Sequence, residues 1–148
     1  MSVEEMRGAY IDELSVGQTA MFSKTVTEAD IVLFAGISGD TNPLHLDAQY
    51  ASQTLFRGRI AHGLLAASLV SAVLGTKLPG PGSIYLGQTL NFKAPVRIGD
   101  TVVARVTVKE IDADKNRVLL ETVCHVGNKA VLDGEAAVMV PARAEAAE

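Results

Sequence analysis

The sequence has a single cysteine, Cys124, so one chain cannot form a disulfide with itself. It also lacks a Cys-x-x-Cys pair and any other Cys/His spacing that is typical of a metal site. Proteins without disulfides are the rule in reducing compartments. We therefore expect a cytoplasmic protein.

Runs of lysine and arginine are missing as well, and the formal net charge is −4. Neither nucleic acid nor an anionic membrane is therefore an expected partner. The longest apolar run, Gly63 to Gly75, includes two serines and is too short to span a bilayer. The first residues are acidic and lack the apolar core of a signal peptide, so we expect a soluble protein with no membrane partner.

The remaining composition is that of an ordinary globular protein. The chain has 148 residues, of which 48% are hydrophobic and 20% are charged. This length is sufficient for one domain with a substantial core. We predict a single domain over residues 1–148, with loose ends at residues 1–10 and 142–148.

Apolar periodicity predicts helices in the first half of the chain and antiparallel strands in the second half. Thr27 and Asp30 form a capping-box pattern at the start of the first helix, and Asp47 is the expected N-cap of a short one. Gly127-Asn128 is a signal for a two-residue hairpin. The predicted helices are 28–36, 47–53 and 64–74, and the predicted strands are 19–25 (an edge strand), 84–93, 102–109, 118–124 and 132–140.

The helix predicted over residues 64–74 is apolar on nearly every face. Such a helix belongs inside a protein. We therefore predict an α+β fold in which one face of a curved antiparallel β-sheet covers this long central helix. One small sheet covers only part of it, which favours self-association as a homodimer.

The stretch 39–47 reads Gly-Asp-Thr-Asn-Pro-Leu-His-Leu-Asp and places Asp40 and His45 five residues apart. Because Pro43 has no N–H and restricts Asn42, we expect a compact turn here and no regular helix. A turn can aim both side chains into one cavity, where they can orient and activate one water molecule. The alternative is that Asp40 only forms an Asx turn or a helix cap, and that His45 is a surface or core residue.

Three blocks of sequence resemble the MaoC-like (R)-specific enoyl-CoA hydratases. They are the stretch 39–47, the stretch Ile-Ala-His-Gly-Leu-Leu-Ala-Ala-Ser-Leu at 60–69, and Gly-Ser-Ile-Tyr-Leu-Gly-Gln-Thr-Leu-Asn-Phe at 82–92. The resemblance extends from about residue 17 to 140. It implies a hot-dog fold, in which a long central helix is wrapped by a curved antiparallel sheet, and usually a dimer. It also implies syn hydration of a trans-2-enoyl-CoA to an (R)-3-hydroxyacyl-CoA.

By this resemblance Asp40 and His45 are the catalytic pair, and the backbone N–H of Gly63 binds the thioester carbonyl. Ser71 corresponds to a serine near the active site in some members. Apart from the resemblance, Asn42 is interpreted first as a turn former, and it is also a candidate for substrate binding that could help to orient the pair. An acid–base pair and an N–H group at a helix start are sufficient for this reaction. We therefore expect an acyl-CoA thioester as partner, no metal and no cofactor. His62 is interpreted as a residue that organises the helix start.

Two other functions fit the same fold. A hot-dog acyl-CoA thioesterase is the first, although such enzymes generally use a lone carboxylate without the Asp-x4-His block. The second is a non-catalytic acyl-binding subunit of a heteromeric dehydratase. Such subunits typically lose the catalytic pair, whereas this chain has both residues.

Overall fold

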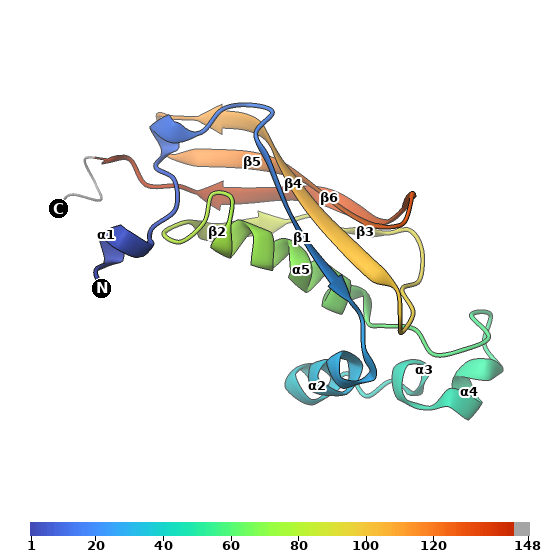
Figure 1. Ribbon diagram of the computed structural model, residues 1–148. Coiled ribbons are helices and arrows are strands. Elements are labelled where there is room, and N and C mark those ends of the chain that lie inside the picture. Colours follow the sequence, from blue (N-terminus) through green and yellow to red (C-terminus); the bar gives the residue numbers. More distant parts are fainter. Residues whose placement is uncertain (144–148) are drawn as a thin grey trace.

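The computed structural model describes residues 1–143 and has two parts, a sheet that curves around one helix and a group of short helices beside the start of that helix (Figure 1). We call residues 27–62 the overhang and the other described residues the body. The helices are α1 (Val3–Met6), a 3-10 turn (Ile11–Glu13), α2 (Glu28–Ser38), α3 (Pro43–Leu46), α4 (Ala48–Ser52) and α5 (Gly63–Thr76). The strands are β1 (Thr19–Thr25), β2 (Ile84–Gln88), β3 (Asn91–Phe92), β4 (Thr101–Asp112), β5 (Arg117–Val126) and β6 (Lys129–Met139).

The strands form one antiparallel sheet in the order β1-β4-β5-β6-β2, and the short β3 also pairs with β6. The edge position of β1 and the two-residue hairpin at Gly127-Asn128 are as predicted. The predicted antiparallel strands would form a simple meander if each paired with the next one in the chain. This order is wrong for β2, which lies beside β6 and not beside β4. Alternation predicts that a segment is a strand but does not tell which strand lies next to it, and here the tight hairpin brings β6 to the place where its free edge accepts β2.

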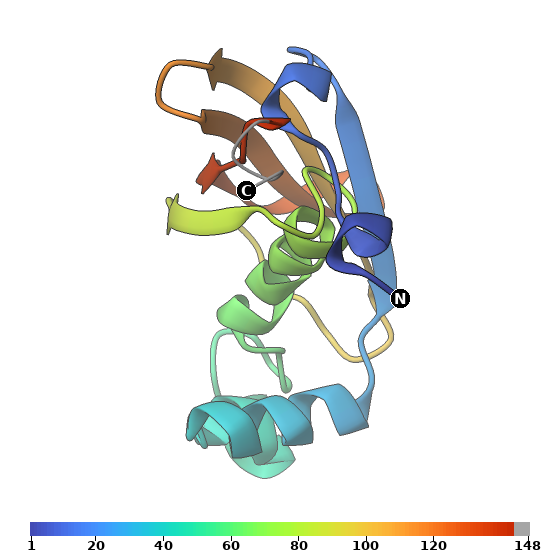
Figure 2. The same cartoon turned by 90° about the vertical axis from the view of Figure 1, so that its left-hand side faces the viewer.

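Helix α5 lies under the concave face of the sheet (Figures 1 and 2). On β4 and β5 the buried side chains alternate with exposed or half-buried ones, and the buried side chains of β4, β5 and β6 pack on the buried side of α5. This is the predicted α+β hot-dog arrangement, with a sheet that does not close on itself. The core consists mainly of Leu65, Leu69, Val70 and Val73 of α5, and of Val102, Ala104, Val106, Val108, Val118, Leu120, Cys124, Leu132, Ala136 and Val138 of the sheet.

The opposite side of α5 is open within one chain. Leu64 is 58% exposed, and Ser68, Ser71 and Gly75 follow it along the same exposed side. Within a single chain the sheet therefore covers only part of this helix, as expected from the sequence, because one curved sheet can cover only one side of a helix.

The N-terminal segment is held more firmly than predicted. The N–H groups of Gly8 and Ala9 donate to the carbonyls of Pro81 and Pro79 at 2.7 and 2.9 Å, and Tyr10 is buried. Residues 8–10 are thus attached to the body, and for residues 1–7 the loose end stays a prediction. Of the loose end expected at 142–148, residues 144–148 lie outside the described residues.

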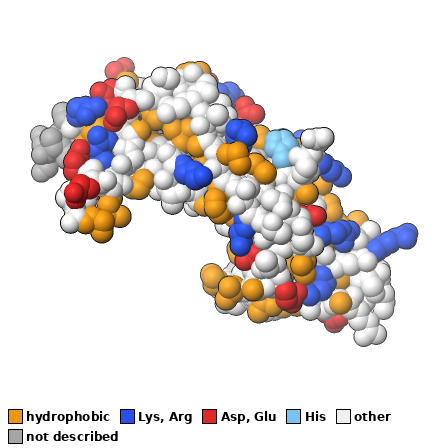
Figure 3. All heavy atoms as spheres, viewed as in Figure 1, with side chains coloured by type: hydrophobic (Ala, Val, Ile, Leu, Met, Phe, Trp, Pro, Cys, Tyr) orange, Lys and Arg blue, Asp and Glu red, His pale blue; other side chains and the backbone are white. Residues whose placement is uncertain are grey.

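No helix among residues 1–143 is both long and apolar enough to cross a membrane. The overhang projects from the body, and hydrophobic side chains gather along its outer edge (Figure 3). On α2 these are Val32, Leu33 and Ile37, the last of which is 84% exposed.

Candidate active site

The first half of the site comes from the end of α2. The predicted capping box starts this helix, because Thr27 Oγ1 accepts from the Asp30 N–H and the Asp30 carboxylate accepts from the Thr27 N–H. The helix ends at Gly39, whose φ of +79° is a left-handed conformation that favours glycine. The chain reverses there and places Asp40 at the edge of the overhang that faces α5.

The carboxylate of Asp40 is oriented by its own turn. Its Oδ1 accepts from the Asn42 N–H at 3.2 Å, which is the Asx turn that the sequence left open as an alternative. Its Oδ2 lies 4.0 Å from His45 Nε2. The Asp40 side chain is 51% exposed. The turn and the convergence with His45 are therefore compatible, since each uses a different oxygen.

His45 lies on α3, one turn of helix that the sequence prediction missed. Pro43 occupies the first helical position, where a missing N–H costs nothing, and the Asn42 side chain caps the turn by accepting from the Leu44 N–H at 3.0 Å. The prediction of a turn without helix is thus wrong for residues 43–46. Asn42 does not line the cavity, since its side chain is engaged in this cap.

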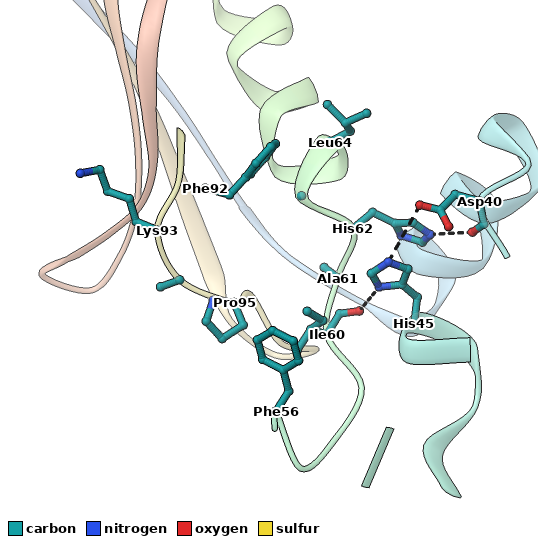
Figure 4. A pocket seen from close by; sticks show the side chains of 12 residues that line it. Asp40, His45, Phe56, Ile60, Ala61, His62, Leu64, Phe92, Lys93 and Pro95 are labelled. Carbon is teal, nitrogen blue, oxygen red and sulfur yellow. Dashed lines mark hydrogen bonds and ion pairs between the residues drawn. The ribbon is translucent and has the colours of Figure 1, made fainter. Parts of the chain in front are cut away.

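The ring of His45 is buried and has a defined orientation (Figure 4). Its Nδ1 lies 2.8 Å from the carbonyl oxygen of Ile60. A carbonyl only accepts, so the hydrogen is on Nδ1, and a neutral ring then has its lone pair on Nε2. That lone pair is on the nitrogen nearest to Asp40 Oδ2.

A cavity of about 440 Å³ connects this pair with the start of α5. It is mostly apolar and is lined by Asp40, His45, Phe56, Ile60, Ala61, His62, Gly63, Leu64, Phe92, Lys93, Ala94 and Pro95 (Figure 4). Its volume is in the range of small-molecule sites. Asp40, His45 and Gly63 are therefore brought together, as expected from the sequence.

Gly63 is the first residue of α5, and its N–H has no acceptor among residues 1–143. The first N–H groups of a helix carry partial positive charge and can bind an oxygen with negative character. A Cβ at Gly63 would lie 2.7 Å from Cε1 of Phe92, so the ring of Phe92 occupies the space of a side chain. The absence of a side chain at residue 63 thus allows the Phe92 ring to pack against the start of α5.

Ser71 is not part of this cavity. It lies eight residues after Gly63, which is about 12 Å along the helix, and it lines a separate cavity of about 140 Å³ with Tyr85 and Val138. Burial raises the pKa of Tyr85 there, and it raises the pKa of the core thiol Cys124 to about 12. Neither group adjoins the Asp40–His45 pair.

Sequence reasoning missed Arg59, which ties the overhang together. Its Nε donates to the carbonyl of His45 at 2.6 Å, and its two terminal nitrogens lie 2.7 and 3.0 Å from the carboxylate of Glu28 at the start of α2. Glu28 and Arg59 are 31 residues apart, and no pattern in the sequence connects them.

Asp40, His45 and His62 also form a group whose possible metal-ligand atoms lie within 4.8 Å of one another. The two imidazoles are stacked, with centroids 3.9 Å apart and planes inclined by 29°. Lone pairs of imidazole nitrogens lie in the ring plane, so those of two stacked rings run side by side and do not converge on one ion. The arrangement suits proton transfer better than metal coordination.

Comparisons with known proteins show the family to which the chain is similar. Residues 13–129 match the family model described as a MaoC like domain. A curated relative from Rhodospirillum rubrum, named (R)-specific enoyl-CoA hydratase, is 54% identical over 143 residues, which cover 97% of this chain and 99% of the relative. Another from Methylorubrum extorquens, named 3-hydroxybutyryl-CoA dehydratase, is 52% identical over 142 residues, which cover 96% of this chain and 90% of the relative. The unliganded structure of R-hydratase PhaJ1 from Pseudomonas aeruginosa superposes with a TM-score of 0.87 at 47% identity, over 93% of this chain and 89% of that one.

Proposed function

The chain belongs to the MaoC-like family, and we propose that Asp40, His45 and the N–H of Gly63 carry out its reaction, the reversible addition of water to a trans-2-enoyl-CoA. The chain is an enzyme of the hydro-lyase class, an (R)-specific enoyl-CoA hydratase, and relatives named for hydration or dehydration of such thioesters match almost all of it. The observation that supports the residue roles is the 4.0 Å separation of Asp40 Oδ2 and His45 Nε2 beside a cavity that reaches Gly63.

The spacing of the pair suits one bridging water. Two hydrogen bonds of ordinary length from one oxygen to atoms 4.0 Å apart enclose roughly 90°, close to the angle between the hydrogens of water. Ionised Asp40 and the Nε2 lone pair of His45 both accept, so the water donates one hydrogen to each. Its own lone pairs then face the cavity and the β-carbon of the substrate.

Addition of this water also requires stabilisation of the thioester oxygen, which becomes an enolate as the C–O bond forms. The N–H of Gly63, at the positive end of α5, lines the same cavity, and we assign it as the donor to that oxygen. Proton removal contributes roughly 10²–10⁴-fold to the rate, and an oxyanion donor contributes about 10²–10³-fold.

Syn stereochemistry follows from having one acid–base pair on one side of the substrate. The pair takes a proton from the water as the hydroxyl adds to Cβ, and it returns a proton to Cα from the same side. Proton and hydroxyl thus reach the same face of the double bond. The (R) configuration at Cβ is set separately, by which face of the substrate is turned toward the pair, and it is the configuration that the relative named (R)-specific enoyl-CoA hydratase supports. No net proton is gained or lost.

The open side of α5 supports a homodimer, and the single cysteine supports a location in the cytoplasm. Leu64 and Phe92 line the cavity and are each more than half exposed, and β2 is a sheet edge with Ile84 and Leu86 exposed. A second copy placed there covers these apolar side chains and closes the cavity. Ser71 lies on the same open side, about 12 Å along the helix from Gly63, but it lines a separate cavity. We therefore propose that any contact of Ser71 with substrate is to the acyl chain far from the thioester.

The test compares the isosteric variants Asp40→Asn and His45→Gln with the wild type. Loss of the enoyl-thioester absorbance of crotonyl-CoA measures hydration, and circular dichroism measures the fold. We expect each variant to keep its fold and to lose at least about 10²-fold in kcat. Activity within a few-fold of the wild type in either variant contradicts the assignment. Free thiol released from a saturated acyl-CoA would instead indicate a thioesterase.

A further inference from the structure

His62 is the third titratable side chain at the site, and the proposed reaction does not use it. It is 2% exposed and immediately precedes Gly63. We propose that His62 is a positioning residue, and this proposal rests on the proposed function. Its Nε2–H holds the backbone of Asp40 near the start of α5. It thereby sets the position of the acid–base pair relative to the Gly63 N–H.

The first support is a hydrogen bond between the last residue of the overhang, directly before α5, and the turn that follows α2. His62 Nε2 lies 2.9 Å from the carbonyl oxygen of Asp40, 22 residues earlier in the chain (Figure 4). The carbonyl only accepts, so His62 carries its hydrogen on Nε2. This bond acts on the main chain of Asp40 and leaves both carboxylate oxygens free for the Asn42 N–H and the water.

The second support is the packing of the ring. His62 stacks on His45 at 3.9 Å between centroids, and Phe34 of α2 approaches it at 4.8 Å with the planes inclined by 51°. One imidazole thus contacts the side chain of His45, the main chain of Asp40 and helix α2. Both members of the catalytic pair are located by the same ring.

The structure argues against two simpler roles. His62 stands at the N-cap position of α5, yet its side chain makes no capping hydrogen bond, so it does not organise the helix start as expected from the sequence. Its Nδ1 is buried without a hydrogen-bond partner among residues 1–143. An unpaired buried nitrogen costs about 1–3 kcal/mol, whereas a phenyl ring would fill the same space without this cost. What the imidazole adds to packing is the Nε2 donor.

A displacement of about 1 Å at a catalytic group can lower the rate by about 10²-fold. Without the His62 N–H, Asp40 is restrained only by hydrogen bonds within its own turn. The distance from its Oδ2 to the Gly63 N–H can then vary. His62 is one of the lining residues, but the apolar walls that bind the acyl chain, such as Leu64 and Phe92, do not depend on its Nε2 donor. The expected effect is therefore on kcat and not on KM.

The test uses two substitutions that separate the donor from the ring. His62→Phe keeps the stacking and removes the donor, and we expect kcat for crotonyl-CoA to fall about 10- to 100-fold, with KM within threefold and an unchanged or higher Tm. His62→Gln places an amide N–H near the position of Nε2, and we expect kcat within about fivefold of the wild type. His125→Phe, the same change on β5 away from the site, is the matched control and should leave kcat unchanged.

Two outcomes overturn the proposal: a His62→Phe enzyme with wild-type kcat, or a folded His62→Gln enzyme as slow as His62→Phe. If His62→Phe does not fold, His62→Asn replaces it, because its shorter amide cannot reach the Asp40 carbonyl and should be slow where His62→Gln is fast.

A spectroscopic arm does not depend on activity. In protein labelled with ¹⁵N-histidine, we expect His62 to show the Nε2–H tautomer and the His45 signals to move in His62→Phe. A Nδ1–H tautomer of His62 overturns the proposal even if the enzyme is inactive. If the wild-type protein itself does not hydrate crotonyl-CoA, the proposed hydratase function has failed, whatever the result for His62.

Discussion

The body and the overhang are held together by different forces. In the body, the inward side chains of β4, β5 and β6 are buried aliphatic residues that pack on α5. In the overhang, α2 has an exposed apolar side, and the catalytic groups are located by single polar bonds, such as those of Arg59, His62 and the Ile60 carbonyl. Burial in the body gives stability, and directional bonds in the overhang give position. Stability and activity should therefore be separable by mutation.

The largest expected effect is on the body. Leu120 on β5 is fully buried, and Leu120→Ala should lower the free energy of unfolding by about 2–5 kcal/mol, because it removes apolar contacts and leaves a cavity. Urea unfolding measures this loss. The kcat of the protein that remains folded should match the wild type, since Leu120 does not reach the active cavity. If the kcat of folded Leu120→Ala falls together with its stability, stability and activity are not separable in this way.

At the boundary between the two parts, Gly63→Ala should slow hydration by about 10-fold or more, since a shift of the oxyanion donor removes part of its contribution. The new Cβ meets Cε1 of Phe92 at 2.7 Å. The double variant with Phe92→Leu removes the ring and should recover activity toward that of Phe92→Leu alone. Kinetics of the four proteins form a double-mutant cycle. If the effects of the two substitutions on the rate simply add, the contact with Phe92 is not the reason why Gly63→Ala is slow.

The smallest effect is expected from Arg59 in the overhang. Arg59→Ala frees the His45 carbonyl and should lower kcat by up to about 10-fold, with a loss of stability of about 1 kcal/mol or less, since the Glu28 side of its ion pair is 58% exposed. Glu28→Gln removes the ion pair and leaves the bond from Arg59 Nε, so it is the matched control and should keep its rate. If Glu28→Gln is as slow as Arg59→Ala, the ion pair and not the bond to His45 positions the ring.

Local signals in the sequence predicted most of the elements. Thr27 and Asp30 form their capping box, and Gly127-Asn128 turns the hairpin, because both signals act between neighbouring residues. The α3 turn was missed for a local reason too, since Pro43 was interpreted as a helix breaker when it stands at the one helical position that tolerates it. The expectation for the candidate site was right in bringing Asp40, His45 and Gly63 to one cavity, and it did not separate Ser71 and Asn42 from them.

By itself, the sequence determined where the chain forms helices and strands, which face of each strand enters the core, and which residues could handle a proton. Apolar periodicity and turn chemistry depend on residues a few positions apart. Only the tertiary structure decided that β2 lies beside β6, that one side of α5 stays open, and that Arg59 and His62 hold the catalytic pair in place. Those contacts join residues 14 to more than 50 positions apart, and their formation depends on how the whole sheet curves around the helix.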